Sequence, residues 1–506
     1  MDTEIELKFL LSDNEVPLIP GLIMQFAKTV KNKPSKNLKN AYFDTPNREL
    51  RALDIGLRTR CCDEQCEQTI KLAGQVVGGL HQRPEYNLPI DTPRPNILAF
   101  KQDIWPHGMQ ITAISDNLFP IFSTNFIRRT WLIETEQGSK IEVVLDKGEI
   151  VAQGQVEAIS ELEIELVEGQ RSDLFLLAEH LIGLGGLRLG LYSKAARGYR
   201  LADDKPLKPN KYIGVVKLNR HATQEHALVQ CVNYGIEFVQ KHEQCYFNKP
   251  SLKTLKRVID GINLIKHAFK LFEPIVEGNA TERLLGEMNW LLSELDWVED
   301  AIHLKTYTSK RHAYYKKINN ADELAALIDD LKAQQPSITD IEDLFHSPRY
   351  NKLLLALTRW LVDKGWRQEW SQHAVSAAEL PIKEVATAAF EKDWRKLQSD
   401  LPEGKDLCTQ DYLALRSLLD CALLSGNCLG SLYDKETRQS FRTPWIDIAY
   451  GIYELETLAY LKTLCEQQNL PELEEIELWL SKKADFLVQA MEQSRRASLN
   501  SMPYWR

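Results

Sequence analysis

The sequence predicts an α+β protein of two domains, in which an antiparallel sheet or barrel is followed by helical bundles. The chain has 506 residues, enough for two or three domains at about 100–200 residues each. Short segments that alternate between apolar and polar residues are confined to residues 1–200, and apolar residues at helical spacing dominate the rest. A polar stretch punctuated by prolines, residues 201–212, separates the two patterns.

Seven alternating segments predict strands in the first domain, and turn sequences such as Asp44-Thr45-Pro46 separate them. The expected strands are residues 4–10, 56–60, 68–72, 85–90, 129–135, 140–145 and 160–167. So many period-two segments in one domain are typical of an antiparallel sheet or barrel. One helix is predicted over residues 173–184, before Gly185-Gly186.

We expect the first domain to span residues 1–203, a linker to span 204–212 and a helical domain to span 213–506. Apolar stripes with helical spacing predict the helices. These stripes are Leu228, Val232, Ile236 and Val239; Ile259, Ile262, Lys266 and Phe269; and Ile476, Leu480, Leu487 and Met491. Many such helices with almost no strand pattern indicate all-α bundles, whose core we expect to include Trp290, Trp297, Trp360 and Trp366.

Composition and charge exclude several classes of protein. The chain carries 62 Lys plus Arg and 71 Asp plus Glu, a formal net charge of −9, unlike the basic balance of a protein that coats nucleic acid. Any anion must therefore bind at a local cluster of basic residues. The sequence opens on acidic residues, and its most apolar stretch, residues 353–362, is short and interrupted by Arg359. These features predict a cytoplasmic protein without a signal peptide, and with no nucleic-acid or membrane partner.

The nine cysteines do not form a regular framework. Cys61, Cys62 and Cys66 lie close together, but neither a C-x-x-C pair nor a Cys/His array completes a zinc site. We therefore expect free thiols in a reducing cytosol.

Charged residues alternate with apolar ones along two of the expected strands. Glu4, Glu6 and Lys8 share one face of the first strand, about 6.6 Å apart from one to the next, and Ile5, Leu7 and Phe9 form the other face. Taken alone, this is typical of an amphipathic strand with a solvated outer face. The pattern recurs at Glu161, Glu163 and Glu165, where three like charges repel unless cations neutralise them.

Acidic and basic residues are sorted onto different strands, since Arg58 and Arg60 form a basic pair and Lys71 ends another segment. Such sorting indicates a closed barrel with a polar lumen. Unpaired ions there cost several kcal/mol each, unless divalent cations and a polyanion neutralise them. The oxygen donors suit Mg²⁺ or Mn²⁺, and the bases suit phosphate oxygens. The pattern predicts metal-assisted phosphoryl chemistry on a polyphosphate.

The chain resembles the triphosphate tunnel metalloenzymes of the CYTH superfamily. The resemblance begins at the E-x-E-x-K segment formed by Glu4, Glu6 and Lys8. It continues in the family's order through residues 42–45, 58–60, 69–71, 83–86, 126–129, 145–146, 163–165 and 192–198. It covers about the first 200 residues and implies an eight-stranded antiparallel barrel that forms a tunnel.

The resemblance also implies the site residues and the reaction. The metal carboxylates would be Glu4, Glu6, Asp146, Glu163 and Glu165, with Glu161 either joining or supporting them. The triphosphate-binding and catalytic bases would be Lys8, Arg58, Arg60, Lys71, Arg128 and Lys194, with Arg129 as the alternative to Arg128. The expected activity is hydrolysis of inorganic triphosphate to pyrophosphate and phosphate with Mg²⁺ or Mn²⁺. We expect His81 to lie in a mobile loop at the tunnel mouth.

Residues 213–506 resemble the CHAD domain, through residues 282–285, 297–300 and 347–360. This resemblance implies two helical bundles that bind polyphosphate through a basic groove. The candidate clusters are Lys253, Lys256, Arg257, Lys266, His267 and Lys270; Lys310, Arg311, His312, Lys316 and Lys317; and Arg349 with Lys352. Each cluster could equally be the solvated face of a surface helix.

Three alternative functions stay open. An adenylate cyclase acting on ATP and a thiamine triphosphatase would use the same charged tunnel. A polyphosphate-binding scaffold with an inert barrel belongs to a different class of protein. The complete set of predicted metal carboxylates argues against the scaffold, because a scaffold has no need of a costly acidic lumen.

Overall fold

The structure is a computed structural model that describes residues 2–62, 65–318, 321–402, 404, 406–468 and 473–506. The chain forms two compact units. Unit 1 is Met1–Lys208 together with Thr339–Asp363, and unit 2 is Pro209–Ile338 together with Lys364–Arg506. The polar stretch at 201–212 therefore contains the first change of unit, whereas the return of residues 339–363 to unit 1 has no counterpart in the sequence pattern.

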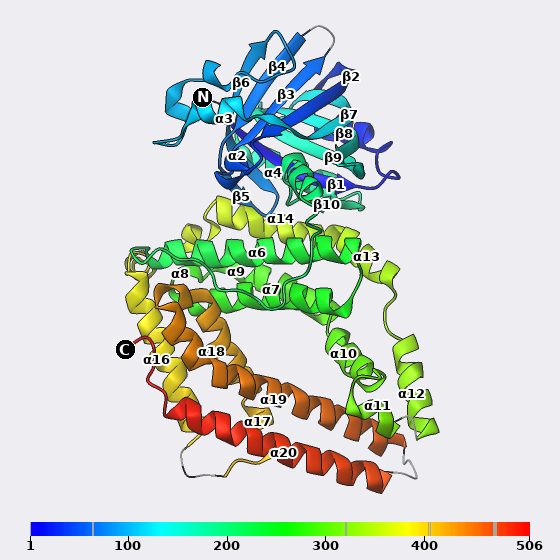
Figure 1. The fold of residues 1–506 in the computed structure, drawn as a ribbon, viewed down its shortest axis with the longest axis vertical. Coiled ribbons are helices and arrows are strands. Elements are labelled where there is room, and N and C mark those ends of the chain that lie inside the picture. The colour runs from blue at the N-terminus through cyan, green and yellow to red at the C-terminus, as the bar shows by residue number, and fades with distance from the viewer. Residues whose placement is uncertain (1, 63–64, 319–320, 403, 405, 469–472) are drawn as a thin grey trace. The chain divides into compact units, whose positions relative to one another are not determined.

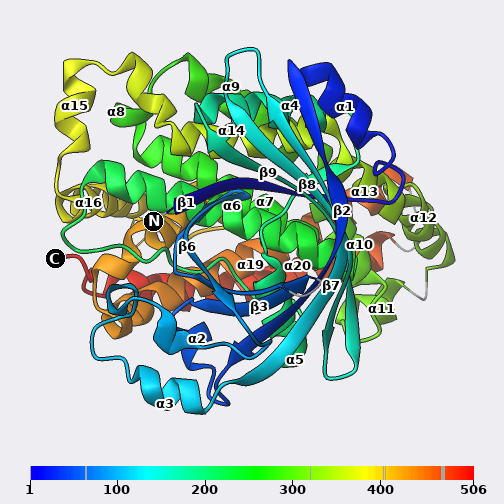
Figure 2. The same ribbon diagram turned by 90° about the horizontal axis from the view of Figure 1, so that it is seen from above.

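Unit 1 contains a closed barrel of eight antiparallel strands, which confirms the predicted fold (Figure 1). Around the barrel lie β1 (Asp2–Leu11), β9 (Gln155–Glu168), β8 (Lys140–Ala152), β7 (Phe119–Glu134), β2 (Thr29–Asp44), β3 (Gly56–Cys62), β4 (Gln65–Lys71) and β6 (Leu80–Ile90). Pairing of β6 with β1 closes the ring, as Figure 2 shows from above. Two short strands, β5 (Gln75–Val77) and β10 (Leu187–Leu189), extend β6 and β1.

Side-chain alternation separates the lumen of the barrel from its covered outer face. Leu7, Phe9, Leu162 and Ile164 are fully buried on the outside, while the charged residues between them point inward. The covering helices of unit 1 are α1 (Ile19–Phe26), α2 (Glu49–Ala52), α3 (Ile111–Asp116), α4 (Arg171–Ile182) and α5 (Lys194–Ala202), with short 3₁₀ turns at Ile97–Ala99 and Gln102–Ile104. The apolar residues thus stabilise the barrel from outside, and the lumen is left to polar groups.

Strand β2 is the barrel element that the sequence pattern did not predict. Its first half is exposed and rich in lysine, and its pairing with β7 shifts register between Lys33 and Lys36, around Pro34. Proline removes a ladder donor and is tolerated at such irregular positions. Without apolar alternation or strand-forming residues in that half, the segment has no period-two pattern to detect.

The expectation of free thiols is wrong for one pair. Cys61 on β3 and Cys66 on β4 are bonded to each other. They are direct cross-strand partners with Cα atoms 4.1 Å apart, which brings the two sulfurs within bonding reach. The free cysteines among the described residues are Cys231, Cys245, Cys408, Cys421, Cys428 and Cys465.

Residues 339–363 contribute one complete helix to unit 1. Helix α14 (Pro348–Val362) follows α13 (Ile338–His346) and packs against α4, β5 and β10. Arg171 of α4 pairs with Asp363 at 2.8 Å, and the Arg359 guanidinium lies 5.8 Å from the ring centroid of Phe175. A segment far along the chain is therefore built into the same compact unit as the barrel.

Unit 2 is helical, as predicted. Its main helices are α6 (Gln224–Asn248), α7 (Leu252–Leu271), α9 (Asn279–Glu294), α10 (Trp297–Tyr307), α12 (Asp322–Ala333), α16 (Ile382–Asp400), α18 (Arg416–Leu429), α19 (Lys435–Gln468) and α20 (Leu473–Leu499). Shorter helices are α8 (Glu273–Val276), α11 (Ala313–Ile318), α15 (Gln372–Ala378) and α17 (Thr409–Ala414), with 3₁₀ turns at Gly365–Glu369 and Gly430–Leu432. No described helix is long and apolar enough to cross a membrane.

The predicted apolar stripes of unit 2 match the structure unevenly. The stripe in α6 is fully buried, as expected. In α7 the expected stripe is wrong, because Ile259 and Lys266 are only half-buried and the buried face runs through Val258, Ile262 and Ile265. Leu487 in α20 is likewise half-buried. Among the four tryptophans expected in the core, Trp360 and Trp366 are buried and Trp290 and Trp297 are half-exposed.

A glycine in β8 allows β7 and β8 to approach beside the lumen. A Cβ atom on Gly148 would lie 2.1 Å from the carbonyl oxygen of Asn125 and 2.4 Å from the Cα atom of Phe126. We expect Gly148→Ala to lower the free energy of unfolding by about 1–3 kcal/mol, the usual cost of overpacking. Gly21→Ala, in α1, is the control, since its Cβ would meet nothing within 4 Å. Equal denaturant midpoints for the two variants would contradict this packing.

Candidate functional site

The barrel lumen is a cavity of about 1060 Å³ lined by charged side chains from most of its strands. It brings together ten residues that the sequence analysis singled out. These are Glu4, Glu6, Lys8, Arg58, Arg60, Lys71, Arg128, Glu163, Glu165 and Lys194. Asp146 lies fully buried beside them, paired with Arg128 and Lys194. The roles assigned to these residues stay predictions.

Strand register explains how these charges meet. Lys8 on β1 is the cross-strand partner of Glu163 on β9, and Arg128 on β7 is the partner of Asp146 on β8. Asp146 is in turn opposite Glu161. Because direct cross-strand neighbours lie about 4.5–5.5 Å apart, closing the barrel in this register places bases and acids in contact.

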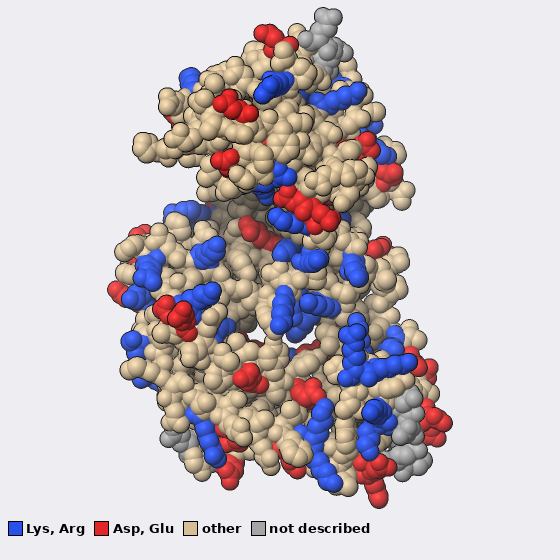
Figure 3. All heavy atoms as spheres, in the orientation of Figure 1, with Lys and Arg blue, Asp and Glu red and all other residues tan. Residues whose placement is uncertain are grey.

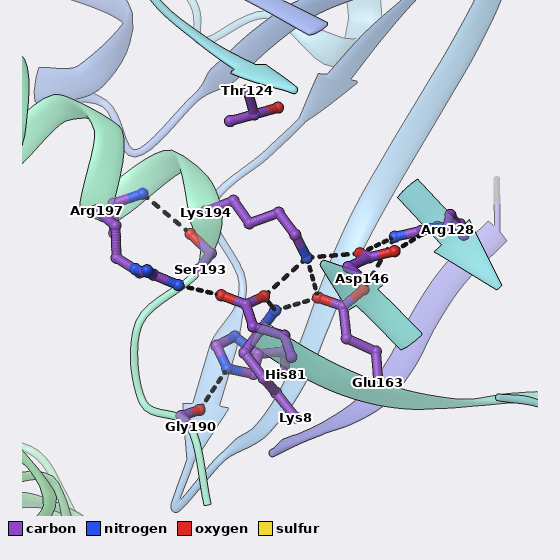
Figure 4. Close-up of polar contacts among 12 residues, drawn as sticks. Lys8, His81, Thr124, Arg128, Asp146, Glu163, Gly190, Ser193, Lys194 and Arg197 are labelled. Carbon is purple, nitrogen blue, oxygen red and sulfur yellow. Dashed lines mark hydrogen bonds and ion pairs between the residues drawn. The ribbon is translucent and has the colours of Figure 1, made fainter. Parts of the chain in front are cut away.

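One wall of the lumen is a buried network of ion pairs, drawn in Figure 4. The Lys194 ammonium lies 2.8 Å from Asp146, 2.7 Å from Glu161 and 2.9 Å from Glu163. Lys8 is also paired with Glu161, at 2.9 Å, and with Glu163. Burial opposes ionisation of both groups, but the facing carboxylates raise the pKa of Lys8 and of Lys194 above their ordinary values. Both lysines are therefore cations fixed at the lumen wall.

Glu161 supports this network from behind. It is fully buried, does not line the cavity, and contacts Lys8, Lys194 and Arg197. Burial alone would raise its pKa, but Lys194, Lys8 and Arg197 lower the pKa of Glu161 to about 2. Of the two roles that the sequence left open for Glu161, its position favours support of the two lysines.

The acidic wall consists of Glu4, Glu6 and Glu165, on β1 and β9. Burial and repulsion from Glu6 raise the pKa of Glu4 to about 7, although Lys71 opposes this shift. Burial and repulsion from Glu4 and Glu6 raise the pKa of Glu165 to about 8. Glu165 is thus poorly compensated by the protein itself, and Glu4 only in part, since Lys71 pairs with it at 2.5 Å. Glu163 differs, because there burial is outweighed by bases that hold the pKa well below its usual range.

The acidic wall fits a divalent cation in its chemistry. Its donors are carboxylate oxygens, the ligands that Mg²⁺ and Mn²⁺ prefer, and their mutual repulsion is the kind that a bound cation relieves. Across the described part of the chain, no three His, Cys, Asp or Glu side chains already stand around a point that could hold a metal ion.

The basic wall carries guanidinium groups that the protein compensates to different degrees. Although burial opposes it, Tyr42 and Glu85 raise the pKa of Arg58. The buried Nε atom of Arg58 has no hydrogen-bond partner. Burial and repulsion from Arg58 and Arg128 lower the pKa of Arg60 to about 9. Asn40 accepts a hydrogen bond from Arg60 Nε at 2.7 Å and fixes the direction of this guanidinium. An anion with several oxygens would relieve both the repulsion and the unused donor.

The two candidate arginines on β7 point in opposite directions. Arg128 lines the cavity and grips Asp146 with two hydrogen bonds, at 2.7 and 2.6 Å. Arg129 is exposed, and its guanidinium lies 5.1 Å from the ring centroid of Trp131. Only Arg128 is therefore placed to contact a ligand in the lumen.

Four further residues line the lumen; the sequence analysis misplaced one of them, and the other three lie in segments that carry the family resemblance. His81, expected in a mobile loop, is 4% exposed on β6 and opposite Glu6. Arg83 and Glu85 follow on the same lumen face, and Tyr42 of β2 is opposite Arg58. Although burial opposes it, Lys71 and Arg58 lower the pKa of Glu85 to about 2. The alternation of His81, Arg83 and Glu85 was the sequence feature that could have identified this face.

The basic clusters predicted in the helical region differ in their surroundings. In the first, Arg257 pairs with Asp260 at 2.9 Å, and His267 is buried against Ser425. In the second, Lys310, Arg311 and Lys316 are exposed. The third cluster, Arg349 with Lys352, lies on α14 in unit 1. On the face drawn in Figure 3, basic and acidic side chains are intermixed over unit 2.

Comparison with known proteins identifies relatives of both parts of the chain. A model of the CYTH domain matches residues 2–199, and a model of the CHAD domain matches residues 235–448. An inorganic triphosphatase from Haemophilus influenzae is 34% identical over 291 residues, which cover 55% of this chain and 80% of the relative.

Two solved structures are also similar to parts of the chain. The CHAD domain from the plant Ricinus communis is 16% identical with a TM-score of 0.44, and the match covers 58% of this chain and 98% of that one. A Hippeastrum protein described as having a dominant triphosphatase activity is 20% identical with a TM-score of 0.29, covering 40% of this chain and 97% of that one.

The opposite orientations of Arg128 and Arg129 provide a matched test of the lumen as an anion site. We expect Arg128→Ala to weaken binding of tripolyphosphate by at least about tenfold, since a charge-assisted hydrogen bond contributes about 1.5–3 kcal/mol. Arg129→Ala should bind like the unmodified protein. Isothermal titration calorimetry measures both, and circular dichroism checks that each variant is folded. Equal losses of affinity would show that the anion does not bind in the lumen.

Proposed function

Because the chain belongs to the CYTH family and carries a CHAD domain after the barrel, we propose that it is an inorganic triphosphatase that uses Mg²⁺ or Mn²⁺. It would hydrolyse triphosphate to pyrophosphate and phosphate. The observation that carries the proposal is the division of one lumen into an acidic wall and a basic wall, in which Glu165 and Arg60 are the least compensated charges. A metal–triphosphate complex has the charges that satisfy both walls.

In this proposal the acidic wall holds the cation and the basic wall holds the substrate. Glu4, Glu6 and Glu165 would bind the cation, and Arg58, Arg60 and Arg128 would bind phosphate oxygens. A divalent cation bound there neutralises phosphate charge and lowers the pKa of the attacking water. Lys8 and Lys194, held by buried carboxylates, would orient the chain of phosphates and stabilise charge that develops during transfer.

The network behind the lysines gives this arrangement its rigidity. Lys8 is 1% exposed and Lys194 is 7% exposed, so neither ammonium can reorient freely in solvent. Donors fixed before the reaction cost no reorganisation when charge develops on the phosphate. Asp146 and Glu163 would act mainly by holding Arg128 and Lys194 in place, a different role from that of the acidic wall.

Phosphate release from a panel of substrates tests the proposal. The panel contains inorganic triphosphate, ATP, thiamine triphosphate and long-chain polyphosphate, each with Mg²⁺, Mn²⁺ or EDTA. We expect the highest kcat/KM with triphosphate and loss of activity in EDTA. Formation of a cyclic nucleotide from ATP would identify an adenylate cyclase, and preference for thiamine triphosphate would identify a thiamine triphosphatase. Binding of polyphosphate without turnover of any substrate would favour the scaffold with an inert barrel.

Polyphosphate is also a proposed ligand of the helical region. The exposed cluster of Lys310, Arg311 and Lys316 supports this assignment more than the α7 cluster does, because Arg257 and His267 are already engaged within the protein. Polyphosphate binding that survives in a variant with an inactive lumen would locate this second site outside the barrel.

Two glutamates on β9 test the acidic wall. Glu165→Gln should lower kcat by about 10²–10³-fold, the size of losing one electrostatic contact made in the transition state. Its thermal stability should hold or rise, because the change removes repulsion with Glu4 and Glu6. Glu168→Gln is the control, since Glu168 is exposed and pairs only with Lys140 among the described ion pairs. Normal kcat in Glu165→Gln would remove this residue from the cation site.

A further inference from the structure

Helix α14 covers a strand edge that would otherwise be left unpaired. Strand β10 is only three residues long and pairs with β1 along one edge, yet Leu187, Arg188 and Leu189 are all at least 92% buried. Buried backbone N–H groups need partners. The α13–α14 corner supplies them on the second edge, where the carbonyl of His346 accepts from the N–H of Gly186 at 3.0 Å.

Asn351 of α14 is the second partner of this edge. It is fully buried, and its Oδ1 atom accepts a hydrogen bond from the N–H of Leu189 at 3.4 Å. Its Nδ2 atom donates to the carbonyls of Phe345 and Ser347, at 2.8 and 3.0 Å. Both polar atoms of the amide are therefore used, in two hydrogen bonds to its own helical corner and one to β10. Burial of an amide is costly without such bonds, so packing alone does not explain an asparagine here.

The segment that Asn351 holds leads directly to the two lumen lysines. The N–H of Gly190 donates to the carbonyl of Lys8 at 2.8 Å, and a Cβ atom on Gly190 would lie 2.9 Å from Lys8 Cγ. The carbonyl of Gly190 is 3.4 Å from His81 Nε2, as Figure 4 shows. Three residues later Ser193 caps α5 by accepting from the N–H of Ala196 at 3.2 Å, and Lys194 is the first residue of that helix.

We propose that Asn351 is a positioning residue of the triphosphate site, acting through residues 187–193 to fix the Lys8 and Lys194 ammonium groups relative to each other. The inference rests on the proposed triphosphatase function. It means that the lumen of the barrel depends on a side chain from the part of the sequence matched by the CHAD model. Activity would then depend on the hydrogen bonds at one edge of β10, and not on the residues that line the lumen alone.

Kinetics of three variants of the full chain test the proposal. Asn351→Leu should lower kcat/KM for triphosphate by about 10–100-fold, as expected when binding groups shift by about 1 Å. The loss should appear in both KM and kcat, because the two ammonium groups would bind the phosphates and stabilise charge that develops during transfer. The Mg²⁺ concentration for half-maximal activity should stay unchanged, because the substitution removes no carboxylate of the acidic wall. Asn351→Asp keeps an acceptor for the Leu189 N–H and should recover part of the loss. Gly190→Ala should reproduce the loss from the lysine side, by displacing Lys8.

Thr358→Val is the matched control for a purely structural effect. Thr358 is also fully buried on α14, but its hydroxyl donates only to the carbonyl of Leu354, in the same helix. This variant should keep normal KM whatever its stability. Hydrogen–deuterium exchange should show faster exchange over residues 187–193 in Asn351→Leu and not in Thr358→Val.

Each outcome of these experiments decides the proposal. Wild-type kinetics in a folded Asn351→Leu protein would overturn it, and so would an equal rise of KM in Thr358→Val. If Asn351→Leu does not fold, Gly190→Ala carries the test, and an unchanged KM there rejects the link to Lys8. If the unmodified chain turns over no triphosphate, the proposed function fails separately. Tripolyphosphate binding in EDTA then replaces KM, and unaltered affinity in Asn351→Leu and Gly190→Ala overturns the positioning role.

Discussion

The buried ion pairs between the lumen lysines and the carboxylates beneath them are the constraint on which the rest of the barrel depends. Lys8 and Lys194 share Glu161 and Glu163 at the centre of unit 1. Removing such charges from water costs several kcal/mol per ion, so the network can exist only if every member finds its partner. The antiparallel register contributes to this, because it sets Lys8 opposite Glu163 and Arg128 opposite Asp146. The outer apolar face must then supply the stability that the network itself does not.

The network also explains why the lumen has two kinds of carboxylate. Glu163 and Asp146 form ion pairs with basic side chains of the protein. Glu4, Glu6 and Glu165 repel one another, and fewer basic side chains neutralise them. A folded protein keeps such repulsion where a ligand relieves it. The same reasoning applies to Arg58 and Arg60 across the lumen, where guanidinium groups lie close to each other. The poorly compensated Glu165 and Arg60 therefore mark where a ligand would relieve repulsion, and the compensated Lys8, Arg128 and Lys194 are donors held rigidly at the lumen.

Helix α14 extends this dependence beyond the barrel sequence. A three-residue strand cannot hold its own position, and β10 is fixed on one edge by β1 and on the other by the α13–α14 corner. Because Gly190 directly follows β10 and only residues 190–193 separate β10 from Lys194, movement of this edge would reach both lysines. In this proposal, a helix from the part of the sequence matched by the CHAD model holds a strand of the barrel unit in place. This role does not require the two units to share a ligand.

The sequence by itself determined the two-domain α+β class, the alternation of charged and apolar residues along β1 and β9, and ten of the residues that line the lumen. These features depend on period and residue type, which are local properties of the chain.

The sequence did not identify β2, whose lysine-rich first half lacks apolar alternation, and it misplaced His81 and the Cys61–Cys66 pair. It could not choose between Arg128 and Arg129, because adjacent residues of a strand face opposite sides and only closure of the barrel decides which side is the lumen. The tertiary structure alone decided which carboxylates are compensated and that Asn351 lies beside β10. Both results depend on contacts between residues that are distant in the sequence, such as Lys8 with Glu163 and Leu189 with Asn351. Such contacts are fixed by strand register and packing of the whole unit and leave no periodic trace in the sequence.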